Sequence, residues 1–178
     1  MSPARGLLVG LSLLLVGACA ATPATDRAVT HVPVAELRGG AGTLPVGAHL
    51  STGQPDAKLL ERAAAAGYVG VIDLRTPGED RGYDEAAVAA SLGLDYVALP
   101  VAGPAGVTFD NAAALDRALA GMDGPVLLHC ASGNRVGALV ALGAKAGGAT
   151  DEEALAAGRA AGLTGLESVV RERLAATD

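Results

Sequence analysis

The stretch Val126–Leu139, which reads VLLHCASGNRVGAL, carries the pattern on which the fold and the chemistry of this chain depend. An apolar run ends at His129 and Cys130, small and polar residues follow, and a second apolar run begins after Arg135. A short apolar run ahead of a glycine turn predicts a buried strand, and the second run predicts a helix starting at about Arg135 or Val136. We therefore expect Cys130 at the carboxyl end of a strand and just before the amino end of a helix.

The same alternation of apolar runs and helical patterns recurs along the chain. Strands that alternate with helices pair in parallel, because each crossover lays a helix on one face of the sheet. The runs lack period-two alternation, as expected of strands covered on both faces. We expect an α/β three-layer sandwich with a mostly parallel sheet of four or five strands. Predicted strands lie at 48–55, 69–74, 95–101 and 125–130, and predicted helices at 56–67, 84–93, 110–122, 135–148, 151–162 and 165–178.

Composition excludes several classes of protein. The chain has 178 residues, of which 51% are apolar and only 2% aromatic, so we expect a core of small aliphatic side chains. The formal net charge is −6, and Lys and Arg do not cluster. A nucleic-acid surface needs concentrated basic charge, so no nucleic-acid partner is expected. The sequence gives no sign of the oligomeric state.

The first residues have the composition of an export signal. Arg5 precedes an apolar run, Leu7–Ala18, that is too short to span a bilayer with ease. The run ends in LVGAC, residues 15–19, which resembles the bacterial lipoprotein box. The resemblance implies that residues 1–18 are a signal peptide and that Cys19 carries a lipid. The chain would then be membrane-anchored at the cell envelope, on the periplasmic or extracytoplasmic face. The alternative is an ordinary secretory signal in which Cys19 has no role.

Residues 19–43 are rich in Ala, Thr, Pro and Gly, and we interpret them as a flexible tether. The run HVPVAEL within them is compatible with a short strand. The globular domain is expected at 44–178. If Cys19 is acylated, Cys130 is the only free thiol, and no intramolecular disulfide is possible. Because small exported domains commonly pair their cysteines, a lone thiol suggests a chemical role.

The surroundings predicted for Cys130 favour that role. A helix amino terminus and the Arg135 guanidinium both stabilise a thiolate, so the pKa of Cys130 is expected below its ordinary value. The backbone N–H groups of the loop can bind an oxyanion, and Arg135 can bind it in two places. The site therefore suits a small anionic substrate. The alternative is a structural cysteine beside a surface arginine. The predicted oxyanion-binding residues are Ala131, Ser132, Gly133, Asn134 and Arg135.

The loop between strand and helix looks like the phosphate-binding loop of cysteine-dependent phosphatases. The wider chain resembles the dual-specificity-phosphatase-like domain that is also found fused to beta-lactamase-like hydrolases. The match covers about residues 44–142 and implies a phosphatase-like fold, with Cys130 as nucleophile and Arg135 as oxyanion ligand. The stretches that carry it are LSTGQP, GYVGVIDLRTPGE, GLDYVALPV and PVLLHCASGNRVGALVAL.

Three departures from ordinary phosphatases stand out. Four residues separate Cys130 from Arg135, one fewer than usual and the same number as in the active loop of rhodanese-type sulfurtransferases. Val136 occupies the position where phosphatases usually have a hydroxyl residue that supports the leaving thiolate. The loop LPVAGPAGV, residues 99–107, contains no Asp or Glu to serve as general acid.

Three functions therefore stay open at this point. The first is a phosphatase in which the Cys130 thiolate attacks a small phosphate ester and forms a cysteinyl-phosphate. The alternative is a rhodanese-like sulfurtransferase that passes sulfane sulfur through a Cys130 persulfide. The second alternative is an inactive oxyanion-binding sensor domain.

Five other residues have possible supporting roles. His129 could hold the loop backbone or help to set the thiolate. Arg75 could add positive charge to the pocket or simply pair with Glu79. Asp110, Glu79 and Asp80 are candidates for the general acid, although Asp110 fits better as a helix N-cap.

No cofactor or metal is predicted. His31 and His49 are too scattered to form a metal site with one cysteine. The glycine motifs of dinucleotide- and phosphate-binding loops do not occur in the sequence.

Overall fold

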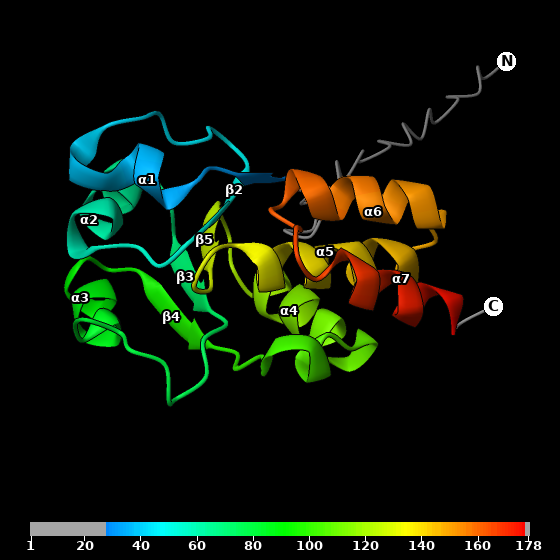
Figure 1. Ribbon diagram of the computed structural model, residues 1–178. Helices are drawn as coiled ribbons and strands as arrows, with labels where there is room; N and C mark the ends of the chain where they lie inside the picture. Colours follow the sequence, from blue (N-terminus) through cyan, green and yellow to red (C-terminus); the bar gives the residue numbers. More distant parts are fainter. Residues whose placement is uncertain (1–27, 177–178) are drawn as a thin grey trace, which may run out of the picture.

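The computed structural model describes residues 28–176, which form an α/β sandwich (Figure 1). The predicted signal peptide and Cys19 lie outside the described residues. No helix within 28–176 is long and apolar enough to cross a membrane. The elements in chain order are β1 Val29–His31, α1 Val34–Leu37, η2 Arg38–Gly40, β2 His49–Thr52, α2 Ala57–Ala65, β3 Gly70–Asp73, α3 Glu85–Ser91, β4 Asp95–Ala98, η3 Gly103–Gly106, α4 Phe109–Ala120, β5 Val126–His129, α5 Asn134–Ala146, α6 Asp151–Ala160 and α7 Glu167–Ala175.

The sheet has five strands, all parallel, in the order β1-β2-β5-β3-β4. The predicted fold class is thereby confirmed. The last strand in sequence, β5, lies in the centre, with Leu127 opposite Leu50 of β2 on one side and Val71 of β3 on the other. The direction of winding reverses at β5. Ligands of open parallel sheets bind beyond the carboxyl ends of strands at such a point, which is where Cys130 lies.

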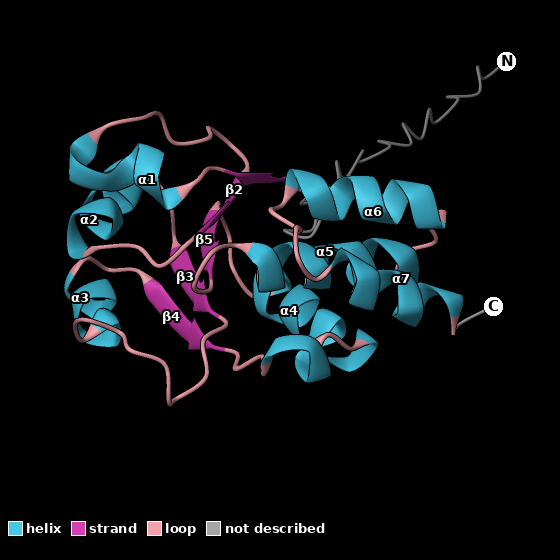
Figure 2. Ribbon diagram, viewed as in Figure 1, coloured by secondary structure: helices cyan, strands magenta, loops and turns pink. Residues whose placement is uncertain are grey.

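The helices cover both faces of the sheet (Figure 2). All residues of β2, β3 and β5 are buried, which explains why their sequences lack a period of two. Val71 and Leu127 pack into the core beneath α1, α2 and α3, whereas Ile72 and Leu128 pack into the core beneath α4 to α7. Each such side chain stabilises the fold by about 1.5–3 kcal/mol relative to an exposed position.

Polar side chains cap most of the predicted helices. Asp56 and Asp84 each accept a hydrogen bond from the backbone N–H three residues later, as expected of N-caps. The predicted cap of α4 is wrong. Thr108 takes that position and accepts from the Asn111 N–H, while Asp110 lies exposed in the first turn. A carboxylate there still interacts favourably with the helix dipole.

The described part of the predicted tether is folded. Residues 29–31 form β1, which pairs with β2 at the edge of the sheet, and residues 34–37 form the short helix α1. The side chain of Leu37 is fully buried in the core beside α2. The domain therefore begins before Leu44. The turn-rich composition of this region had led us to expect its start at Leu44.

Glycines allow α5 and α6 to approach closely. A Cβ on Gly137 of α5 would lie 2.1 Å from the backbone nitrogen of Leu163 and 2.6 Å from the carbonyl oxygen of Gly158. Both neighbours are backbone atoms, which cannot move without shifting α6 and the turn after it. This contact fixes the position of α5, whose first turn carries the Cys130 loop.

We predict that Gly137→Ala lowers the free energy of unfolding by about 1–3 kcal/mol or more, because the added methyl group overpacks the α5–α6 interface. Urea unfolding followed by circular dichroism measures the change. Gly121→Ala is the matched control, because its Cβ would be in ordinary contact, 3.5 Å from the nearest oxygen. Equal stability of the two variants would contradict the interface described here.

Candidate active site

The loop after β5 curls around the sulfur of Cys130. The strand ends at His129, and α5 begins at Asn134 with Gly133 as its N-cap. Gly133 has φ of 87°, a left-handed conformation that glycine adopts without strain. This conformation directs the Gly133 N–H to the Cys130 sulfur, at an N–S distance of 3.1 Å. The sulfur therefore lies at the floor of the loop, at the amino end of α5.

The segment after β2 braces the loop from outside. Gly53 and Ser132 form an isolated antiparallel bridge, and the Gln54 N–H donates to the Ala131 carbonyl at 3.4 Å. A Cβ on Gly53 would lie only 3.0 Å from the same carbonyl oxygen. These residues belong to the LSTGQP stretch, whose contact with the loop was not apparent from the sequence.

The side chains of Asn134 and Val136, at the start of α5, contact other parts of the fold rather than the sulfur. The Asn134 side chain accepts hydrogen bonds from the backbone N–H groups of Thr164 at 2.8 Å and Leu166 at 3.3 Å, so it ties α5 to the segment before α7. Only the backbone of Asn134 could therefore bind an oxyanion. Val136 is fully buried in the core beneath α5 and offers no hydroxyl group to the site.

The Arg135 guanidinium turns inward, toward the ends of β3 and β4. Its Nη1 donates to the carbonyl oxygens of Leu74 at 3.2 Å and Val101 at 3.1 Å. The carboxylate of Glu79 accepts from Nη1 at 2.7 Å and from Nη2 at 2.6 Å. These contacts engage both protons of Nη1 and one proton of Nη2, and the guanidinium also forms a hydrogen bond with the Cys130 side chain. An oxyanion bound at Cys130 would meet the N–H groups on this side of the guanidinium.

The charges of Glu79 and Arg135 stabilise each other. The hydrogen bond with Glu79 is the main reason why the pKa of Arg135 is raised, and the Cys130 sulfur contributes in the same direction. Conversely, Arg135 lowers the pKa of Glu79 to about 2, helped by the Thr76 N–H, which donates to Glu79 Oε1 at 2.7 Å. Glu79 is therefore ionised at neutral pH. It holds Arg135 in place and cannot donate a proton to a leaving group.

His129 belongs to a buried charge cluster behind the loop. Its Nε2 lies 2.8 Å from Glu85 Oε1 and 3.7 Å from Asp73 Oδ1, although the contact with Glu85 is not aligned for a hydrogen bond. Arg75 bridges the two carboxylates and donates to both oxygens of Asp73 at 2.9 Å. All four side chains are almost completely buried. His129 thus links the end of β5 to a fixed set of ionisable side chains.

The position of Arg75 corrects one prediction. Arg75 is fully buried and pairs with Asp73 and Glu85, not with Glu79. Glu79 pairs instead with Arg135. Arg75 was misassigned because its partner Glu85 lies in α3 and reaches it only through the fold.

Arg81 and Tyr96, which the sequence did not single out, complete this cluster. Both contact Asp73 Oδ2, and the Tyr96 hydroxyl donates to it at 2.8 Å. Burial alone would raise the pKa of Asp73, but the hydrogen bonds from Arg75, with the electrostatic interaction with His129 and the hydrogen bond from Tyr96, hold it well below its usual range. Burial, followed by the contact with Asp73, raises the pKa of Tyr96 to about 12. In the sequence, the one indication of this cluster was Asp73, a charged residue near the end of the otherwise apolar run VGVIDL.

One group of side chains in the described region has ligand atoms close enough for a metal ion. Asp73, Glu85 and His129 place one ligand atom each within 4.8 Å of one another. The Arg75 guanidinium contacts both carboxylates and already supplies the positive charge that they require. These residues therefore fit an internal ion-pair network better than a metal centre.

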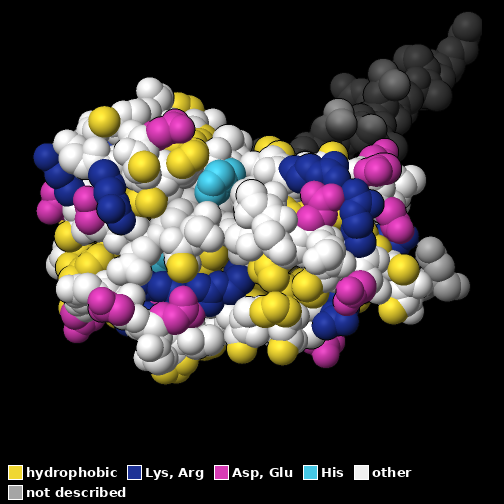
Figure 3. All heavy atoms as spheres, in the orientation of Figure 1, with side chains coloured by type: hydrophobic (Ala, Val, Ile, Leu, Met, Phe, Trp, Pro, Cys, Tyr) yellow, Lys and Arg dark blue, Asp and Glu magenta, His cyan; other side chains and the backbone are white. Residues whose placement is uncertain are grey.

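The other two acid candidates, Asp80 and Asp110, are exposed. Asp80 is exposed, and its Oδ1 accepts from the Gly82 N–H at 2.9 Å, which closes a turn. Asp110 is exposed on α4. On the face of the molecule in Figure 3, acidic and basic side chains are interspersed, and neither sign of charge forms a large patch.

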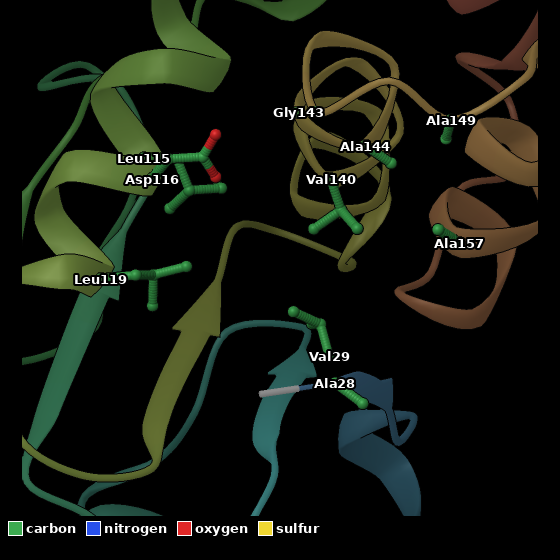
Figure 4. Close-up of a pocket in the computed structure, with 11 residues that line it drawn as sticks. Ala28, Val29, Leu115, Asp116, Leu119, Val140, Gly143, Ala144, Ala149 and Ala157 are labelled. Atoms are coloured by element: carbon green, nitrogen blue, oxygen red, sulfur yellow. The ribbon is translucent and has the colours of Figure 1, made fainter. Parts of the chain in front are cut away.

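A cavity of about 640 Å³ lies away from the loop (Figure 4). It is bounded by α4, the second half of α5, α6 and the start of β1. Its lining is largely Ala, Gly, Val and Leu, with Asp116 as the one charged side chain. Burial raises the pKa of Asp116. Because the cavity contains neither the thiol nor Arg135, it carries none of the chemistry discussed here.

The fold and the Cys130 loop together define the class of cysteine-phosphatase-like α/β domains. Residues 46–149 match the family described as "Beta-lactamase hydrolase-like protein, phosphatase-like domain". The match covers more than half of the chain, and the chain belongs to this family. The resemblance inferred from the sequence is thus confirmed.

Two curated relatives share this region. The chain is 34% identical over 95 residues to the beta-lactamase hydrolase-like protein of Agrobacterium fabrum and 40% identical over 95 residues to that of Xylella fastidiosa. Each match covers 51% of this chain but only 22% of the relative. The chain thus spans about a fifth of the length of the curated relatives it matches.

Solved structures support the same fold. A candidate phosphatase from Neisseria meningitidis superposes with a TM-score of 0.60 at 22% identity, over 71% of this chain and 90% of that protein. Kinase-associated phosphatase, with its catalytic-site cysteine replaced by serine, gives a TM-score of 0.51 at 19% identity, over 68% of this chain and 79% of that one. At these identities the likeness concerns the fold alone.

We predict that the Glu79–Arg135 pair stabilises the protein above pH 4.5, the ordinary pKa of Glu79, and that this contribution is lost as the pH falls toward 2. Acid weakens the fold because Glu79 takes up its proton at a higher pH in the unfolded chain than in the folded protein. Glu79→Gln should cost about 1 kcal/mol at pH 7, the upper end for a partly exposed ion pair, and almost nothing near pH 2. Urea unfolding at both pH values measures the change in the free energy of unfolding. The control is Glu61→Gln, a substitution of an exposed residue of α2. An equal loss at both pH values would show that the charge is not responsible.

Proposed function

We propose that this protein is a cysteine-dependent phosphatase that cleaves a small phosphate ester at the Cys130 loop. The observation that carries the proposal is the position of the Cys130 sulfur, which accepts the Gly133 N–H and lies beside Arg135. Both groups stabilise negative charge on sulfur. The N–H groups of Arg135 on the side of Cys130 and the backbone N–H groups at the start of α5 can bind the phosphoryl oxygens.

In the first step the Cys130 thiolate attacks phosphorus. The S–P bond forms while the P–O bond to the ester oxygen breaks, and that oxygen departs as an anion with the electron pair of the bond and then takes up a proton from water. Arg135 holds two phosphoryl oxygens through its N–H groups on the side of Cys130. Glu79 keeps the guanidinium in that orientation. The cysteine residue is only 1% exposed, so the substrate phosphoryl group must reach the sulfur through the mouth of the loop.

In the second step water attacks the cysteinyl-phosphate. The new P–O bond forms as the S–P bond breaks, which releases inorganic phosphate and restores the thiolate. Val136 supplies no hydroxyl group to support the leaving sulfur, so this support falls to the Gly133 N–H and the α5 amino terminus. Slow release of phosphate is the expected consequence.

The leaving group receives little help from the protein. Glu79 is ionised and engaged, and the segment 101–107 contains no carboxyl group. Without a general acid, an ester whose oxygen leaves readily as an anion reacts best. We therefore infer a preference for aryl phosphates and other esters of acidic alcohols over alkyl phosphates.

A second candidate function, sulfur transfer, is favoured by the short loop. Only four residues, Ala131–Asn134, separate Cys130 from Arg135. A persulfide sulfur is smaller than a phosphoryl group, and its leaving group needs no proton. In this reaction the Cys130 thiolate takes the outer sulfur of thiosulfate, sulfite leaves, and cyanide then accepts the sulfur as thiocyanate.

The two candidates are separated by one pair of assays on the purified chain. We expect release of nitrophenolate from p-nitrophenyl phosphate, loss of this activity in Cys130→Ser, and a decrease of about 100- to 1000-fold in Arg135→Lys, since the ammonium group cannot replace the two-point contact. Thiosulfate with cyanide is tested in parallel. Thermal unfolding checks that both variants are folded.

Thiocyanate formation without ester hydrolysis would replace the phosphatase by the sulfurtransferase. No turnover in either assay, with vanadate still bound by the loop, would support the oxyanion sensor instead. Activity that survives in Cys130→Ser would exclude Cys130 as nucleophile in both the phosphatase and the sulfurtransferase.

We further propose that the protein acts in the cell envelope, anchored by a lipid on Cys19. The support is the sequence LVGAC at the end of an apolar run. We predict that the chain incorporates radioactive palmitate when expressed in a bacterium and that Cys19→Ala does not. Label that persists in Cys19→Ala, or its absence from the wild type, would rule out the lipid anchor without affecting the phosphatase proposal.

A further inference from the structure

We propose that His31 is a positioning residue for the Cys130 loop, and that its imidazole keeps the Gly133 N–H directed at the Cys130 sulfur. The inference rests on the proposed function, because it concerns how the same loop is held ready for reaction. His31 is the last residue of β1 and lies outside the region 46–149 that matches the family. It is therefore an addition to the part of the chain that the family defines.

The imidazole of His31 lies between two glycines. A Cβ on Gly133 would be 2.4 Å from Cε1 and 2.7 Å from Nδ1 of His31. A Cβ on Gly162, in the turn after α6, would be 2.7 Å from the same Nδ1. Any side chain at either glycine would collide with the ring. The ring thus packs directly on the backbone of the loop, on the side of Gly133 where a side chain would otherwise project.

This contact matters because Gly133 is the least restricted residue of the loop. Glycine populates positive and negative φ about equally, so the peptide before Gly133 can rotate at little cost unless neighbours prevent it. Rotation would turn its N–H away from the sulfur and remove the hydrogen bond of 3.1 Å. The His31 ring fills the space beside Gly133 on the side where a Cβ would project. In our proposal this contact keeps Gly133 at φ of 87°.

His31 is itself held by three elements. It pairs with Ser51 across β1 and β2, and its Nδ1 lies 3.4 Å from the Ser51 hydroxyl oxygen. That hydroxyl donates its proton to the Ala161 carbonyl at 2.7 Å, so Nδ1–H of His31 is the donor to Ser51. Ala161 directly precedes Gly162. The ring is thereby fixed between the sheet, the loop and the turn after α6, beside which β1 runs in Figure 1.

The surroundings of His31 favour its neutral form. Burial lowers its pKa, and the contact with Ser51 and the charge of Glu36 oppose that shift without reversing it. Glu36, in α1, is the charged side chain of the described residues that acts on His31 through space. Protonation in acid would place a cation against the Gly133 backbone and disturb the contact. The amide of Gly133 should therefore report the titration of His31.

The test compares His31→Ala and His31→Gln with Thr30→Ala in the full chain. Thr30 is exposed on the same strand and is the matched control. We measure the alkylation rate of Cys130 by iodoacetamide at pH 6 and the proton chemical shift of the Gly133 amide. His31→Ala should slow alkylation by about tenfold, the factor that corresponds to one hydrogen bond to a charged group. His31→Gln should slow it less, and Thr30→Ala not at all.

In the wild type, the Gly133 amide shift should titrate with a midpoint below the ordinary pKa of histidine, and His31→Gln should abolish that titration. An unchanged alkylation rate in folded His31→Ala would overturn the proposal. If that variant does not fold, a Gly133 amide that fails to titrate in the wild type has the same consequence. Since neither readout uses a phosphate ester, failure of the phosphatase assay alone would leave the role of His31 intact.

Discussion

The hydrogen bond from the Gly133 N–H to the Cys130 sulfur is the contact on which the site depends. It requires a left-handed residue at the amino end of α5, and α5 can lie where it does only because Gly137 allows α6 to approach. The central place of β5 brings Cys130 between the ends of β2 and β3. Each level of structure therefore supports one short N–H to sulfur distance.

Charge is arranged around this contact in two separate sets. Arg135 and Glu79 form a partly exposed pair at the mouth of the site. Asp73, Arg75, Glu85 and His129 form a fully buried set behind it. Buried ion pairs rarely add stability, but removal of one partner leaves a charge without compensation. The second set is therefore best understood as a rigid support for the end of β5, and in the proposed function the first is the part that would meet the phosphate ester.

Much of this arrangement could be predicted from local patterns. The parallel sheet, the strand that ends at Cys130 and the caps Asp56 and Asp84 follow from hydrophobic runs and turn residues, which act over a few positions. The partners of Arg75 and Arg135 could not be predicted in this way. Glu79 and Glu85 stand six residues apart in neighbouring loop and helix, and only the fold decides which arginine each one meets. The short strand considered for HVPVAEL was misplaced: β1 covers residues 29–31 and residues 34–37 form α1, because three residues in a Pro- and Gly-rich region are too few to show a period.

The direction of β1 has a consequence for how the protein presents itself. All strands are parallel, so β1 enters at the edge of the sheet opposite the Cys130 loop and covers about 10 Å before it reaches the level of the loop. Residue 28 therefore lies at the end of the sheet opposite the one that carries Cys130. A support attached at residue 28 would leave the Cys130 loop facing diffusing solutes rather than that support.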